Sequence, residues 1–529
     1  MLGIGRRFVL TVLIATIAQF TGVATVPASG ADATITVNPG QIVRSVPPGV
    51  VGWGAMWKRA FLQPPPPADF TDASHAAYIQ EVGAALAPLV RASDTRHLSW
   101  PWGVSFSTWG VNWENSARPW SERPLDCARI PIINHGSGWC EKTIVGVGDL
   151  MTLAKIWELE AITVSVPLSV LDGSVPRWGP GFFDQAFPPD VIEQISDHAR
   201  ALVDFMKAHP AWDSIPRIFL AAGCEWRHYK LENPSSAVLT YVALVRRIRE
   251  KIPESKVFIV ASASDSADIT GPAPGVPSVE AVQAASWNRY LHEGLAGIPG
   301  IALDLHRYRG MIGAQAAADG TTPMTPANID VLLSTGVSQR QFLAVHPEQW
   351  GGEGTPMPSV LLENAIHGKT ADHDTHSDEA RPWPVAMAHA DLVREALASP
   401  ALAFLGWTWF PEDLPAEWPH GAIRDGQLAL HARAQAFLSQ YHQGALVGSA
   451  VDGDDAVRAN AVRWPNGALY VYGGNFSREP RSVTVSVEGY SAARAHVEIL
   501  REGRRTAKRW GGRRPLRLPP MSLFRMRVR

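Results

Sequence analysis

The chain has 529 residues, a formal net charge of -2 and 19% charged residues, which together exclude an overall electrostatic attraction to nucleic acid. Its 42 prolines and 45 glycines indicate a loop-rich globular protein, long enough for one large domain and a smaller one. Core packing is a poor explanation for all 20 tryptophans, because a buried indole N–H needs a partner. Many stand in predicted loops, where flat apolar walls with a polar edge suit sugar rings.

Residues 1–31 predict a cleaved signal peptide. Arg6 and Arg7 precede the apolar run 8–26, which is followed by small residues. Because no later segment approaches 18 uninterrupted apolar residues, we expect a secreted or periplasmic protein without a membrane span. An uncleaved anchor is the alternative.

The three cysteines suit an exported chain with at most one disulfide. Cys127 and Cys140 bracket a glycine-containing loop and are the expected pair, which leaves Cys224 as a free thiol. Three separate thiols are the alternative.

Residues 49–443 alternate short apolar strands with amphipathic helical patterns. The strands are predicted at 49–57, 88–93, 161–169, 217–226, 256–264, 301–308, 341–350 and 403–410. Continuous apolar strands covered by helices are typical of a parallel sheet that is buried on both faces. Eight such units predict an α/β fold of the (β/α)8 TIM-barrel type. A doubly wound open sheet is the alternative, but GxGxxG does not follow the first strand.

Residues 444–529 have a different pattern, in which short alternating or apolar runs are separated by turn residues. This pattern predicts a small antiparallel β-sandwich after the barrel. Residues 32–48 contain the alternating run "ATITVN", which we expect to add a strand to the sandwich.

Two glutamates stand at ends of predicted barrel strands, where such barrels carry their functional side chains. Glu225 follows the fourth strand and Glu348 ends the seventh. Two carboxylates across one cleft are what retaining glycoside hydrolysis requires. We expect Glu225 to be the acid/base and Glu348 the nucleophile, with Glu353 as the competing nucleophile. Structural salt bridges with arginines at the barrel rim are the alternative.

Other strand ends and the flanks of Glu225 supply the expected substrate-binding residues. They are Trp53, Arg91, Cys224, Trp226, His306, Tyr308, Trp407 and Trp409. Arg91 is also expected to keep Glu348 ionised. Trp407 and Trp409 alternate on a strand and therefore share a face. Ordinary rim packing is the alternative for His306 and Tyr308.

This arrangement resembles clan A glycoside hydrolases. "AAGCEW" resembles the clan's Gly-Asn-Glu signature, "PLVRAS" its strand-two arginine, and "LDLHRY" its strand-six His-x-Tyr. A barrel followed by a β-sandwich is most similar to the β-xylosidases, the α-L-arabinofuranosidases and the glucosylceramidase-like members. The resemblance implies a carbohydrate substrate, an acid/base after strand four and a nucleophile after strand seven. Cys224 stands where the clan usually has the asparagine that binds the sugar 2-hydroxyl. This implies that another group binds the hydroxyl, that the substrate differs, or that catalysis is lost.

Two further functional classes remain open. One is a non-catalytic carbohydrate-binding protein on a decayed barrel, and the other is a metal-dependent hydrolase that uses the His/Asp-rich loop 367–380. That loop has no HExxH or calcium-loop spacing, so we expect a solvated lid, no metal and no cofactor. The run from Arg501 to Arg529 holds eleven Lys or Arg against one acid. We expect a solvated strand face there, with a site for an anionic glycan or envelope surface as the alternative.

Overall fold

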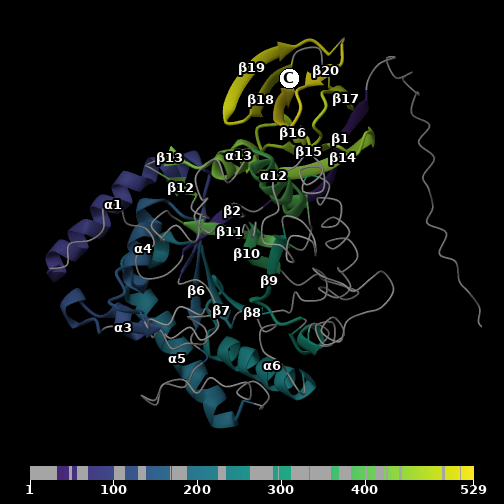
Figure 1. The fold of residues 1–529 in the computed structure, drawn as a ribbon. Coiled ribbons are helices and arrows are strands. Elements are labelled where there is room, and N and C mark those ends of the chain that lie inside the picture. Colours follow the sequence, from purple (N-terminus) through teal and green to yellow (C-terminus); the bar gives the residue numbers. More distant parts are fainter. Residues whose placement is uncertain are drawn as a thin grey trace, which may run out of the picture.

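A closed barrel and a nine-stranded sheet make up most of the described chain (Figure 1). The computed structural model describes residues 32–46, 51–55, 70–100, 113–124, 126–128, 139–166, 168, 187–223, 234–262, 287, 290–295, 297–310, 333, 359–367, 383–398, 402–410, 422–424, 427–439, 444–490, 495–512 and 514–528. Within these ranges, the longest helices are too polar or too short to cross a membrane.

The barrel consists of eight parallel strands that close in the order β10-β11-β2-β3-β6-β7-β8-β9. Their bounds are β2 Val51–Ala55, β3 His97–Trp100, β6 Ala161–Val166, β7 Arg217–Ala222, β8 Val257–Ser262, β9 Ile301–Gly310, β10 Ser359–His367 and β11 Leu402–Phe410. The chain visits these strands in order around the barrel, so the predicted (β/α)8 fold is confirmed.

Helices follow most of the barrel strands and cover their outer faces. The longer ones are α1 Asp72–Ala92, α4 Val147–Ile156, α5 Pro189–Ala208, α6 Pro234–Lys251, α12 Trp383–Ala398 and α13 Leu430–Ser439. The short elements are α3 Trp113–Ala117, η1 Trp120–Glu122, η2 Trp212–Ser214, β12 Ile423–Arg424 and β13 Gln427–Leu428. Capping fixes where α1 starts, since the Thr71 hydroxyl accepts a hydrogen bond from the Ser74 N–H at 3.1 Å.

The second barrel strand lies later in the chain than the predicted segment 88–93. That segment is the last turn of α1, which continues through Pro88. The buried positions Val82, Ala87 and Val90 keep helical spacing across the proline, which explains why the helix extends. The strand itself is β3, whose inner positions are polar, and it therefore has no apolar run to reveal it.

The seventh barrel strand also differs from its prediction. We predicted it at 341–350, but the strand between β9 and β11 is β10, residues Ser359–His367. Segment 341–350 lies outside the described residues. β10 carries Glu363 and Asn364 in its middle, so the uninterrupted apolar run "FLAV" gave the stronger strand signal.

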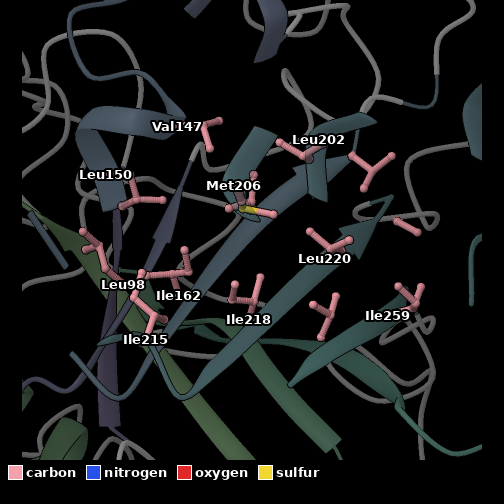
Figure 2. Packing of buried hydrophobic residues seen from close by; sticks show 14 of the residues in the cluster. Leu98, Val147, Leu150, Ile162, Leu202, Met206, Ile215, Ile218, Leu220 and Ile259 are labelled. Atoms are coloured by element: carbon pink, nitrogen blue, oxygen red, sulfur yellow. The ribbon is translucent and has the colours of Figure 1, made fainter. Parts of the chain in front are cut away.

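Apolar side chains fill both surfaces of the barrel wall. Outward-facing Ile162, Leu220 and Ile259 belong to the large cluster beneath the helices, and Figure 2 shows this layer with residues of α4 and α5. Inside the barrel, a second cluster contains Phe219 and Val260. The barrel is therefore a packed core, and space for a ligand has to be sought at its rim.

The nine-stranded sheet joins the C-terminal region to the strand that precedes the barrel. Its strands are β1 Ala33–Ser45, β14 Ala445–Gly453, β15 Val457–Arg463, β16 Leu469–Asn475, β17 Arg481–Val487, β18 Ala495–Arg501, β19 Arg504–Trp510, β20 Leu516–Leu518 and β21 Ser522–Val528. β1 pairs antiparallel with β14 and parallel with β17. One core cluster includes Trp510 and Leu516, from strands at opposite ends of the sheet order. The sheet therefore curls around a single apolar core.

The outer face of this sheet packs on the last two barrel helices. Met387 of α12 and Phe437 of α13 share a buried cluster with Tyr472 and Leu523 of the sheet. In Figure 1, α12 and α13 lie between the barrel strands and the C-terminal sheet. The two domains therefore share a continuous apolar contact.

A short hairpin brings the two predicted disulfide partners together. β4 Asp126–Ala128 pairs antiparallel with β5 Trp139–Glu141, and Cys127 is directly opposite Cys140. Directly opposed residues have Cα atoms about 4.5–5.5 Å apart, a separation that a disulfide spans. The bond between the two cysteines remains a prediction.

Candidate active site

The end of β7, the fourth barrel strand, is anchored by a buried tyrosine. The Tyr241 hydroxyl donates to the Ala222 carbonyl and accepts from the Ser262 N–H at 2.8 Å. Trp287 donates its indole N–H to the Ser262 carbonyl at 3.2 Å and stacks on Tyr241. The carboxyl ends of β7 and β8 are thus tied to each other through two aromatic side chains.

A glycine with positive φ directly follows β7. Gly223 is buried and has φ 98°, in the region that favours glycine. Glu225 follows two residues later and lies outside the described residues, as do Cys224 and Trp226. The count of barrel strands makes β7 the fourth, so Glu225 follows the expected strand in the chain.

The strand pairings relate the end of β7 to Glu363 of β10 through the two strands between them, β8 and β9. Ala222 pairs with Ala261, and the next residue of β8, Ser262, pairs with Asp304 of β9. Two residues beyond Asp304, His306 pairs with Glu363 of β10. Glu225 is likewise two residues beyond Gly223, which follows Ala222. His306 and Glu363 therefore pair beyond the level of Ala222, where β7 ends, and Glu225 itself lies outside the described residues.

Strand six carries His306 and Tyr308, as the sequence predicts. Both lie on β9, and their cross-strand partners on β10 are Glu363 and Ala365. The ladder is irregular between Val360 and Glu363. Such bulges are frequent next to active sites, where they re-aim a side chain.

The expected position of the second carboxylate is corrected by this topology. Glu348 precedes β10 in the chain, so it does not end the seventh strand, and it lies outside the described residues together with Glu353. The sequence analysis missed Glu363. The signal was available, because "SVLLE" is an apolar run that reaches a glutamate, the same pattern that singled out Glu225.

Arg91 does not belong to the predicted site. It lies in the last turn of α1, and its exposed guanidinium is 3.7 Å from the Glu158 carboxylate. In a (β/α)8 barrel, helix ends of this kind lie at the amino-terminal ends of the strands, opposite the active-site face. The predicted position of Arg91 on the second strand is therefore corrected to the end of α1.

Three of the expected substrate-binding tryptophans, Trp53, Trp407 and Trp409, lie on the adjacent strands β2 and β11. Trp53 of β2 pairs with Trp407 of β11, and Trp53 is fully buried in the main core cluster. Its burial favours a packing role, and its expected sugar contact remains a prediction. β11 has one extra residue between Trp407 and Trp409 relative to β2. The side chains of Trp407 and Trp409 lie outside the described ones, so their shared face remains a prediction.

A histidine inside the barrel supports the wall below the rim. His97 of β3 is fully buried, and its Nε2 lies 2.7 Å from Oγ1 of Thr163. The ring stacks on Phe219 at a centroid distance of 5.5 Å. Burial, and secondarily the charge of Arg217, lowers the pKa of His97 well below its usual range. His97 is therefore a neutral packing residue at pH 7.

The strand-seven side is secured from outside the barrel by a buried charge network. Asp391 and Arg394 of α12 form an ion pair at 2.7 Å, and Asp391 also pairs with Arg458 of β15. Arg394 donates to the Asn460 amide oxygen at 2.9 Å, and Arg458 donates to the Leu333 carbonyl at 2.7 Å. This network links α12, which follows β10, to the curled sheet.

Among the residues described, no cluster of three or more His, Cys, Asp or Glu side chains could hold a metal ion. Most of the His/Asp-rich loop lies outside them, with only His367 at the end of β10 included. The possibility of a metal in that loop is therefore untested.

The fold is that of known glycoside hydrolases, as the resemblance to clan A predicted. A family 51 arabinofuranosidase from Xanthomonas axonopodis pv. citri superposes with a TM-score of 0.65 and 13% identity, covering 94% of this chain and 100% of that one. For a family 44 endoglucanase from Clostridium thermocellum the TM-score is 0.58 with 12% identity, and the coverage is again 94% and 100%. A family 30 endoxylanase from Clostridium papyrosolvens gives 0.53 and 10%, covering 94% and 99%. No protein-family model and no curated protein sequence matches the chain.

Proposed function

We propose that this chain is an exported retaining glycoside hydrolase that cleaves O-glycosidic bonds of a poly- or oligosaccharide. The observation that supports the proposal is that β7, the fourth barrel strand, ends three residues before Glu225, and that Glu363 lies on β10, the seventh. The fold shared with arabinofuranosidases, endoglucanases and xylanases supports the same chemistry.

In the proposed mechanism, Glu225 is the acid/base and Glu363 replaces Glu348 as the nucleophile. The Glu363 carboxylate attacks the anomeric carbon while Glu225 protonates the leaving oxygen, and Glu225 then deprotonates the water that hydrolyses the glycosyl-enzyme. Double displacement requires the two carboxyl groups to be about 5–5.5 Å apart.

The two glutamates need opposite protonation states before reaction. Glu363 has to be ionised, and His306, its cross-strand partner, is proposed to support that charge together with Tyr308. Glu225 has to start protonated, which the negative charge of Glu363 and the neighbouring Trp226 would favour. Cys224 is a weak hydrogen-bond partner, so another group is proposed to bind the sugar 2-hydroxyl.

Activity on a panel of nitrophenyl glycosides and neutral polysaccharides, beginning with α-L-arabinofuranosides, tests the proposal. Glu363→Gln should lower kcat by about 10⁴-fold or more on every substrate, as loss of a nucleophile does. Glu225→Ala should lose about 10²–10⁴-fold on natural substrates and less on activated ones. Azide should restore turnover in Glu225→Ala only, since a small anion can replace the activated water.

Glu348→Gln distinguishes the two assignments of the nucleophile, and Glu158→Gln serves as a matched control on an exposed barrel residue. Loss of activity in Glu348→Gln with retention in Glu363→Gln would overturn the proposed nucleophile. Sugar binding without turnover by the unmodified protein would favour the non-catalytic alternative that Cys224 raises.

A further inference from the structure

We propose that the edge of the curled sheet binds an acidic polysaccharide through the guanidinium and ammonium groups of β19 and β21. β19 is the first strand in the sheet order and therefore an edge, and six of its seven residues are exposed. In Figure 1 it is the outermost arrow of the yellow C-terminal domain. We call Arg504, Lys508, Arg509 and Arg527 the basic edge.

The cations of the basic edge lie on two strands, β19 and β21, which flank β18. Arg509 of β19 is opposite His496 of β18, and His496 is opposite Arg527 of β21. Cross-strand partners share a face, and neighbouring strands lie about 4.8 Å apart. Arg504 and Lys508 occupy the other face of β19. A polysaccharide that lies along this edge can therefore contact Arg509 and Arg527 on one face and Arg504 and Lys508 on the other.

The acids nearby are already paired with other cations. Glu498 forms ion pairs with Arg505 and Arg525, and Glu502 with Arg501. In the described part of the sheet, no carboxylate lies within ion-pair distance of the basic edge. The whole chain has a formal net charge of -2, so this positive charge is a local concentration and not a property of the entire protein.

Protection of an open strand edge does not account for the whole set. Lysine and arginine on an edge strand discourage edge-to-edge pairing with other chains. Arg527, however, lies on β21, which pairs on one side with β18 and on the other with β16. A cation on an interior strand protects no edge, and its exposure suits a ligand better.

A half-buried tryptophan near Arg527 favours a sugar polymer over other polyanions. The Arg527 guanidinium lies 5.9 Å from the ring of Tyr470, which is buried, and Tyr470 contacts the half-buried Trp464 at 4.8 Å between centroids, so Trp464 is the ring of this pair that can reach a ligand. Arginine binds carboxylates in a bidentate manner, while aromatic rings stack on the apolar faces of sugars. A uronic-acid polymer offers both groups. The choice of a glycan as ligand rests on the proposed function.

Affinity electrophoresis and calorimetry with polygalacturonate, a carboxylated polysaccharide, test the proposal. We expect the intact protein to bind it, with affinity that falls as salt is added. Arg504→Gln/Arg509→Gln/Arg527→Gln should weaken binding about tenfold at low salt, since each exposed charge pair contributes modestly. Arg118→Gln/Lys155→Gln/Arg246→Gln removes the same charge from the exposed barrel surface and should bind as the parent does.

Binding is measured without turnover, so its failure is separate from failure of the glycosidase proposal. Absence of binding, or equal weakening in both triple variants, would overturn the basic edge as a site. Equally tight binding of duplex DNA or of anionic vesicles by the parent protein would overturn the choice of a polysaccharide. Circular dichroism of each variant verifies that the sheet is folded.

Discussion

The two sides of the barrel that carry the proposed carboxylates are held in different ways. On the strand-four side, β7 keeps regular register with both neighbours, and Tyr241 and Trp287 anchor its end with neutral hydrogen bonds. On the strand-seven side, β10 has register irregularities with both neighbours. Its following helix, α12, is held from outside by buried charges that extend into the curled sheet.

This difference suggests that the C-terminal sheet is a structural partner of one half of the site. In the proposed site, Glu225 follows a strand of regular register whose end is held by hydrogen bonds within the barrel domain. Glu363 instead depends on a bulged strand whose supporting helix needs its charged contacts outside the barrel. Variants on the two sides should therefore fail in different ways.

The largest effect is expected from Asp391→Ala, because it leaves Arg394 and Arg458 buried without their carboxylate. Breaking a buried ion pair in this way costs about 3–5 kcal/mol, measured as the free energy of unfolding in urea. The exposed pair of Arg247 and Glu193 is the control. Arg247→Met should shift the unfolding midpoint far less, because water screens that pair. Equal shifts would mean that the buried network does not secure α12.

Tyr241→Phe tests the strand-four side. It removes the hydroxyl that bonds to Ala222 and Ser262, and an unsatisfied buried group costs about 1–3 kcal/mol. Because Glu225 follows Ala222 closely, kcat should also fall. Tyr490→Phe, which removes an exposed hydroxyl contact at 3.4 Å, should change neither quantity. An unchanged kcat in a destabilised Tyr241→Phe variant would show that the Tyr241 hydrogen bonds stabilise the fold but do not position the catalytic residue.

Gly223→Ala tests whether the backbone conformation of the glycine after β7 matters for activity. The φ of 98° at Gly223 disfavours any side chain, so alanine should cost about 1–2 kcal/mol of stability. Gly467, with φ 79° in an open hairpin turn, provides a comparison in the sheet. Gly467→Ala should destabilise to a similar degree while leaving kcat unchanged, whereas Gly223→Ala should lower kcat. Equal losses of activity in Gly223→Ala and Gly467→Ala would argue against a special role for the glycine after β7.

The smallest expected effect is on the pH dependence of stability. The folded-state pKa of His97 is lowered by burial, so the unfolded state binds a proton that the native state does not. Stability should therefore be full above pH 6.5 and fall below it, by at most about 1.4 kcal/mol per pH unit for this group. His97→Asn should flatten the curve between pH 6.5 and 5 in urea titrations. An unchanged slope would show that other groups control acid unfolding.

The eightfold βα rhythm, the β7 strand and its place as strand four could be predicted from the sequence. β7 is a short apolar run buried on both faces, which local composition reveals directly. β3 could not be recognised in this way, because His97 and Ser99 fill the barrel there. β10 was missed because Glu363 and Asn364 interrupt it, although its apolar start ends in a glutamate as the segment after β7 does. Arg91 was misplaced because a proline normally ends a helix, whereas the buried spacing around Pro88 continues it.

Covalent trapping tests the assignment of the two carboxylates most directly. The protein is incubated with the 2-deoxy-2-fluoro glycosyl fluoride that matches its best substrate, and the adduct is located by mass spectrometry. Cleavage after Met357 places Glu348 and Glu363 on different peptides. We predict a single glycosyl adduct on Glu363, formed also in Glu348→Gln and absent in Glu363→Gln. An adduct on Glu348, or turnover without any trapped intermediate, would contradict the account.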